Sequence, residues 1–113
     1  MTKILFLLVA GKDSPERANL ALMMVSRQIK AKRYEDVKVL LYGPSEEFVA
    51  ELQGDAKEAF NEIVKAGALD SACSFIAKKY DIELKLQSMN VTLLPFGERL
   101  ARYVNEGYEV ITF

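Results

Sequence analysis

The residues from Ile4 to Ala10 form an unbroken apolar run that does not alternate with polar residues. A strand with one solvated face would alternate, so this run predicts a central parallel strand that is covered on both faces. It is too short to span a bilayer, and Gly11-Lys12-Asp13 follows it where a signal peptide would have small residues for cleavage. We therefore expect a cytoplasmic protein without membrane contact, in which this run is the first strand of a sheet.

Further apolar segments alternate along the chain between strand-like and helix-like spacing. Strands are expected over residues 37–42, 68–72, 91–94 and 108–113, and helices over 15–31, 45–52, 55–66, 74–80 and 98–106. Residues 82–89 fit either a strand or a helix. Such alternation predicts βαβ units with right-handed crossovers, and 113 residues suffice for one domain. The expected fold is therefore a single three-layer α/β/α domain with a parallel sheet, covering residues 1–113.

Composition excludes several classes of function. The formal net charge is -1, with 15 basic and 16 acidic residues, and no basic stripe points to nucleic acid. The chain has no histidine, which excludes Cys–His and Ser–His catalytic pairs and histidine metal sites. One cysteine cannot form an internal disulfide. We expect no metal and no cofactor.

In a parallel sheet, ligands bind outside the carboxyl ends of the strands, where loops lead into helices. Four such loops are expected, at residues 11–14, 43–45, 71–74 and 95–97. The residues of these loops that are candidates for binding a ligand are Asp13, Ser14, Gly43, Ser71 and Ser74. The third loop also contains the cysteine, Cys73.

Cys73 is the candidate catalytic residue. At the start of a helix, the macrodipole and free backbone N–H groups favour a thiolate, and Ser71 and Ser74 could add hydroxyl hydrogen bonds. The alternative is that Cys73 is a small buried hydrophobic residue without chemistry. The sequence leaves both interpretations open.

Charged residues near helix starts offer a weaker candidate for chemistry. Asp13 or Glu16 could act as a base in a hydrolase or transferase, but their spacing forms no catalytic constellation. Glu46 and Glu47 are interpreted as solvated charges that complement a helix dipole. Ser14 is expected to cap the first helix, with Pro15 at its first position.

Three apolar residues of the first helix, Leu20, Met23 and Met24, lie outside its core-facing stripe. Either this helix is covered on more than one side, or it contacts another subunit. Surplus apolar surface on a small domain often marks an interface, so we expect an oligomer.

Two segments, residues 71–82 (SACSFIAKKYDI) and 106–113 (EGYEVITF), together with the order of the elements, resemble the small DsrE/DsrF-like proteins of the DsrEFH superfamily. The resemblance extends over essentially the whole chain. It implies a five-stranded parallel sheet and a homotrimer or homohexamer. It also implies that Cys73 accepts sulfur as a persulfide from a donor and passes it to a partner protein or a small thiol.

Two functions are therefore expected from the sequence. The first is a sulfur carrier that uses Cys73, whose thiol exchange needs neither a histidine base nor a metal. The alternative is a non-catalytic oligomeric module that binds a small ligand or a protein, with Cys73 as a structural residue.

Overall fold

A single five-stranded sheet organises the computed structural model, which describes all residues from Met1 to Phe113. The strands are β1 (Lys3–Leu8), β2 (Asp36–Leu41), β3 (Leu69–Cys73), β4 (Leu93–Leu94) and β5 (Glu109–Thr112). The helices are α1 (Pro15–Ala31), α2 (Pro44–Ala50), α3 (Gly54–Lys65), α4 (Ser74–Lys79), α5 (Glu83–Ser88) and α6 (Phe96–Asn105). All neighbouring strands are parallel, in the order β4-β3-β2-β1-β5. The predicted α/β fold is confirmed.

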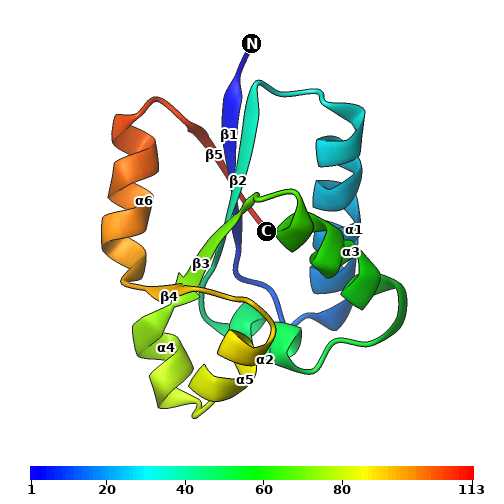
Figure 1. Cartoon of the computed structure of the whole chain (residues 1–113), viewed down its shortest axis with the longest axis vertical. Coiled ribbons are helices and arrows are strands. Elements are labelled where there is room, and N and C mark those ends of the chain that lie inside the picture. The colour runs from blue at the N-terminus through cyan, green and yellow to red at the C-terminus, as the bar shows by residue number, and fades with distance from the viewer.

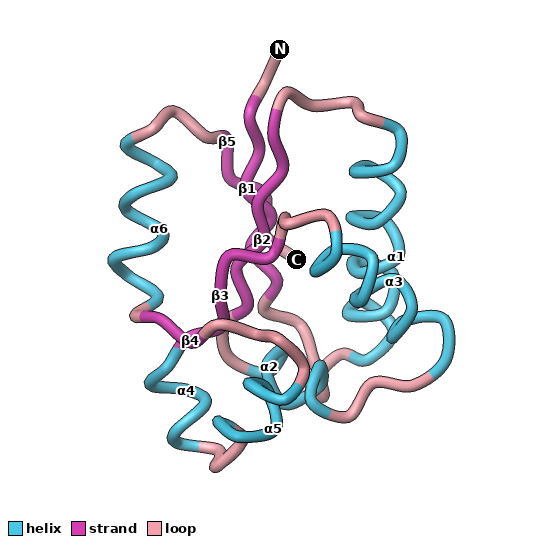
Figure 2. The backbone as a smooth tube through the Cα atoms, viewed as in Figure 1, coloured by secondary structure: helices cyan, strands magenta, loops and turns pink.

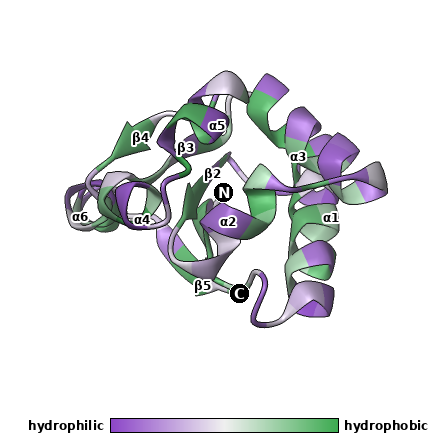
Figure 3. Ribbon diagram, turned by 90° about the horizontal axis from the view of Figure 1, so that it is seen from below, coloured by the Kyte–Doolittle hydropathy of each residue, from purple (hydrophilic) through white to green (hydrophobic).

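Helices cover both faces of the sheet, with α1 and α3 on one face and α6 on the other (Figure 1). The chain steps from β1 to β4 in one direction and then returns across the sheet to β5 at the opposite edge. A right-handed crossover in the reverse direction must pass over the other face, which explains why α6 is separate from α1 and α3. Seen from below, largely hydrophobic strands lie between these two layers (Figure 3).

The short helices α2, α4 and α5 gather at the carboxyl end of the sheet, at the bottom of Figure 2. They follow the ends of β2 and β3 and contact one another. The carboxyl edge is therefore crowded with helix starts and loops, whereas the opposite edge is formed by simple connections (Figure 2).

The two faces of the sheet differ in how they are held. A cluster of 19 buried apolar residues lies on the face of α1 and α3. The cluster on the α6 face contains only Leu5, Leu40 and Tyr103 as buried members. Because apolar burial is the main stabilising term in folding, the α6 face depends more on polar contacts.

Asp70 supplies those contacts. A register shift between Val39 and Leu40 places an extra residue in β3, and Asp70 lies there, in contact with α6. Its carboxylate accepts two hydrogen bonds from the Arg99 guanidinium, at 2.9 and 2.7 Å, and one from the Tyr103 hydroxyl at 2.6 Å. This network fastens α6 to the sheet.

Several expected boundaries are wrong by a few residues. β1 ends at Leu8 because the N–H groups of both Val9 and Ala10 donate to the carbonyl of Phe113, which stops the regular ladder. The strand expected over 91–94 is only two residues long, because the N–H of Val91 bonds to the carbonyl of Leu86 instead of to the sheet. α6 begins at residue 96 rather than 98.

The ambiguous residues 82–89 form a helix, α5. Leu86 is fully buried, and Ile82 and Met89 pack against the main core, as helical spacing requires. Leu84, which a strand would have placed on the same face as Leu86, is exposed. No helix of the structure is both long enough and apolar enough to cross a membrane.

Candidate functional site

The four expected loops come together at the carboxyl edge of the sheet. A Cβ atom added to Gly11 would lie 2.0 Å from the carbonyl oxygen of Pro44, so the first loop touches the second and tolerates only glycine there. The rings of Tyr42 and Phe96 stack with centroids 4.1 Å apart, which joins the second loop to the fourth. Cys73 lies at the end of β3, in the third loop.

The turn at Gly43 directs the chain from β2 into α2. Its φ of 77° lies in the region that favours glycine, and Pro44 then opens the helix. The hydroxyl of Ser45 donates to the carbonyl of Leu8 at 2.6 Å and accepts the N–H of Tyr42 at 3.1 Å. These bonds tie α2 to the ends of β1 and β2, and they fix the direction of the next side chain, Glu46.

Glu46 is the residue that links the second and third loops. Its Oε2 accepts the N–H of Gly43 at 3.3 Å and the N–H of Cys73 at 3.2 Å. The Gly43 bond satisfies the N–H of the N-cap residue of α2, as the Glu of a capping box does, although Gly43 has no side chain for the reciprocal bond. The Cys73 bond extends the β2–β3 ladder, because the carboxyl oxygen stands where a further strand carbonyl would be.

The other oxygen of Glu46 has no partner. Glu46 is fully buried, and Oε1 makes no hydrogen bond. Burial without a neighbouring cation penalises the charged form and raises the pKa of Glu46 to about 8, although the Gly43 and Cys73 N–H groups act in the opposite direction. Near pH 7 the carboxyl group is therefore mostly neutral. Because Oε2 already accepts two bonds, the proton belongs on Oε1.

Cys73 is buried, with 5% of its surface exposed, and it directly precedes α4. Ser71 pairs with Leu40 of the α6-face cluster, so strand alternation places the Cys73 side chain on the α6 face as well. Tyr42 follows the pair Leu41–Ala72 and is therefore level with Cys73. The stacked rings of Tyr42 and Phe96 thus lie beside the approach to the sulfur from the α6 face.

The side chains of the remaining predicted site residues make no hydrogen bond to Cys73. Asp13 is exposed, and its Oδ1 accepts the N–H of Gly11 at 2.9 Å, a bond within the turn. The Ser71 hydroxyl donates to Asp70 at 2.9 Å, so the expected bond to the cysteine is wrong. Ser74 is half-buried at the first position of α4.

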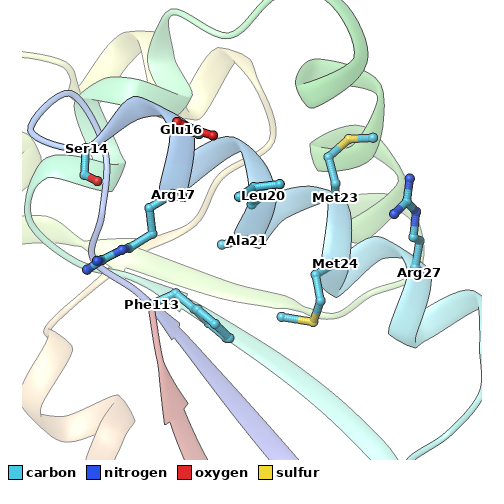
Figure 4. Close-up of a pocket in the computed structure, with 9 residues that line it drawn as sticks. All are labelled: Ser14, Glu16, Arg17, Leu20, Ala21, Met23, Met24, Arg27 and Phe113. Carbon is cyan, nitrogen blue, oxygen red and sulfur yellow. The ribbon is translucent and has the colours of Figure 1, made fainter.

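Ser14 precedes α1 but makes no side-chain cap bond, which corrects that prediction. It lies instead at one end of a groove beside α1 with a volume of about 620 Å³ (Figure 4). This groove is separate from Cys73, because none of the residues 71–74 lines it. Of the predicted residues, Gly43 and Cys73 are brought together, and Glu46 joins them.

Of the two Glu residues expected at the surface, only Glu46 departs from its prediction. The expectation that Glu46 is a solvated helix-start charge is wrong, since the side chain is buried. Glu47 does lie near the surface, where Lys12 approaches it to 3.4 Å. The sequence carried only half of the capping-box signal for the first contact of Glu46: the Glu stands three residues after the N-cap position, but Gly43 occupies that position instead of Ser or Thr. Its second contact needs β2 and β3 to be neighbours.

No group of three or more Cys, Asp and Glu side chains is placed to hold a metal ion. The site therefore consists of a thiol, a buried neutral carboxyl group and two backbone N–H groups. In this arrangement the carboxyl group bonds to the backbone of the cysteine without placing a net charge beside it near pH 7.

Comparison with solved structures identifies one with the same fold. The structure of BT1422, a conserved protein of unknown function from Bacteroides thetaiotaomicron, matches with a TM-score of 0.79 and 15% sequence identity, covering 96% of this chain and 94% of that one. At this identity the likeness shows the fold alone. No model of a known protein family matches the chain, and no curated protein matches it significantly.

Proposed function

We propose that this protein is a cytoplasmic sulfur carrier that accepts sulfur as a persulfide on Cys73 and passes it to a partner protein or a small thiol. The observation that carries the proposal is the bond from the Cys73 N–H to the buried carboxyl group of Glu46, at the edge of the sheet where parallel α/β proteins bind ligands. The resemblance of residues 71–82 and 106–113 to DsrE/DsrF-like proteins supports the same role.

The transfer is a thiol exchange without net oxidation. The Cys73 sulfur attacks the outer sulfur of a donor persulfide, or a sulfur of an inorganic polysulfide, and forms a new S–S bond. The donor's own S–S bond breaks, and its electron pair leaves on the inner sulfur. That sulfur becomes a thiol by taking up the proton that Cys73 has lost. A second exchange passes the outer sulfur to the acceptor.

Glu46 favours this exchange by being neutral. An ionised carboxylate next to Cys73 would repel a thiolate or a persulfide anion, whereas the protonated group does not. Its Oε1 has no hydrogen-bond partner in the protein, the Cys73 sulfur included, so donating the Oε1 proton to an anionic sulfur requires a local movement of the side chains. Access requires movement, because the thiol is buried beside the Tyr42–Phe96 stack.

The test is sulfur loading under anaerobic conditions, followed by the intact mass of the protein. We expect polysulfide to add the mass of one or more sulfur atoms to the wild type and nothing to Cys73→Ser, with the adduct removed by a small thiol. An unchanged mass of the wild type, or the same adduct on Cys73→Ser, contradicts the proposal.

Glu46→Gln is the matched variant for the role of the carboxyl group. Glutamine keeps an acceptor for the two N–H groups and a donor at the other position, but it cannot ionise. At pH 7 we expect this variant to take up sulfur at the same rate as the wild type. At pH 9, where Glu46 of the wild type is charged, we expect the variant to take up sulfur several-fold faster than the wild type. Equal pH profiles of the two proteins would remove Glu46 from the mechanism.

The burial of Cys73 favours a second candidate, a binding module in which the cysteine only packs. In that case the folded protein resists alkylation of Cys73 even with small reagents, and polysulfide leaves its mass unchanged. Loading of the native protein by polysulfide decides against this candidate.

A further inference from the structure

The side of α1 that faces away from the core carries a row of four residues, Glu16, Leu20, Met23 and Arg27. Their spacing of four, three and four residues places them on one face of the helix. The opposite side packs into the core through Ala18, Ala21, Leu22 and Val25. The row therefore contributes little to the fold of this chain.

This row is apolar in the middle, and a groove runs beside it. Leu20 is 63% exposed, and Met23 is half-buried. Met24 and Phe113 line the groove, whose volume is about 620 Å³ (Figure 4). An exposed apolar row beside an open groove of this size is typical of a contact surface.

The order of residues in the row is self-complementary. Consider a two-fold axis perpendicular to α1, at the height along the helix that is halfway between residues 21 and 22. This axis would place Glu16 opposite Arg27 of the second copy, because the two residues lie equally far from it along the helix. The same operation places Leu20 opposite Met23 of the second copy. Both pairs occur twice, which is the defining property of a two-fold contact between identical surfaces.

We propose that two copies of this chain associate through antiparallel α1 helices, with Leu20 and Met23 in the centre and Glu16–Arg27 ion pairs at both ends. Methionine side chains adapt to irregular space, so Met23 and Met24 can fill the groove around Leu20 of the second copy. A net charge of -1 per chain leaves little long-range repulsion between copies. This proposal does not depend on the function of Cys73.

Charge reversal with rescue tests the contact, with light scattering and sedimentation as the measurements. We expect the wild type to associate at micromolar concentration. Glu16→Arg and Arg27→Glu each place two like-charged pairs in the contact and should raise the dissociation constant about tenfold or more. The double variant, which restores opposite charges, should return it to within about threefold of the wild type.

Controls separate the contact from effects on folding. Leu20→Asp should abolish association while leaving the circular dichroism spectrum unchanged, because the residue is exposed. Glu83→Arg, a charge reversal in α5, should leave association unchanged. A monomeric wild type, an assembly of three copies only, or a double variant that stays as weak as the single ones would overturn the proposal.

Discussion

Two carboxyl groups with little exposure make hydrogen bonds at β3, Asp70 from the strand itself and Glu46 from α2, and their pKa values are shifted in opposite directions. Burial alone would raise the pKa of Asp70, but hydrogen bonds from Arg99, Tyr103 and Ser71 outweigh it and hold that pKa below its usual value. Glu46 has no cation and only backbone donors, so burial dominates and its pKa is raised. The first is a satisfied structural ion, and the second is a neutral acid with one free oxygen.

The ionised Asp70 and the neutral Glu46 are suited to different roles. A buried charge that is fully paired holds two elements in one geometry, as Asp70 holds α6 against β3. A buried acid with an unpaired oxygen costs stability, and such costs are common at functional sites. Because Glu46 bonds to the backbone of the only cysteine, we connect this cost in stability with the sulfur transfer proposed for Cys73.

The largest expected effect concerns pH. The folded pKa of Glu46 is about 8 and its ordinary value 4.5, so its contribution to stability is complete below about pH 4.5 and is lost as the pH rises to about 8. One pKa unit is worth about 1.36 kcal/mol, so the wild type should lose about 4 kcal/mol relative to Glu46→Gln between pH 5 and pH 9. Urea unfolding of both proteins across this range measures the difference. A constant difference would show that Glu46 ionises normally.

Removing the cation from Asp70 should have the next largest effect. Arg99→Met leaves the buried carboxylate with only two neutral donors, and we expect a loss of about 3 kcal/mol in the free energy of unfolding at pH 7. Asp70→Asn in the same background should recover part of the loss, because the uncompensated charge is gone. Equal stability of the single and double variants would contradict the ionic account of this network.

The aromatic stack should control access to the thiol. Tyr42→Ala and Phe96→Ala each remove one ring of the stack that lies beside Cys73, so we expect alkylation of the native protein by iodoacetamide to accelerate about tenfold through easier local opening. Leu84→Ala, on the exposed side of α5, is the control and should leave the rate unchanged. If neither ring variant reacts faster, the thiol is reached by another route.

The smallest effect is expected at Ser71. Ser71→Ala removes one of the neutral donors to Asp70 and should cost about 1 kcal/mol, since the ion pair with Arg99 remains. Ser88→Ala, whose exposed hydroxyl donates only within its own helix turn, should change stability by less than about 0.5 kcal/mol. Chemical denaturation at pH 7 distinguishes the two.

The sequence predicted the layers and the strand-end position of Cys73, because apolar runs and helical stripes are local patterns that survive folding. It did not predict Glu46, since the importance of that residue comes from a contact 27 positions away along the chain. Asp70 was missed for a similar reason, because its partner Arg99 lies 29 positions away along the chain. The contact also depends on the register shift in β3, which makes Asp70 an extra residue that faces α6. Residues 82–89 were ambiguous because Ile82 and Leu86 fit both periods, while Leu84 fits only a strand and Met89 only a helix.

The contrast between the two carboxyl groups rests on the protonation state of Glu46. Its side-chain carboxyl carbon, labelled with 13C and followed by NMR, reports that state directly, with Glu46→Gln to assign the signal. We predict a titration midpoint near pH 8 in the folded protein. A midpoint near its ordinary value of 4.5 would mean that a charged carboxylate stands beside Cys73, and it would contradict this account of the site.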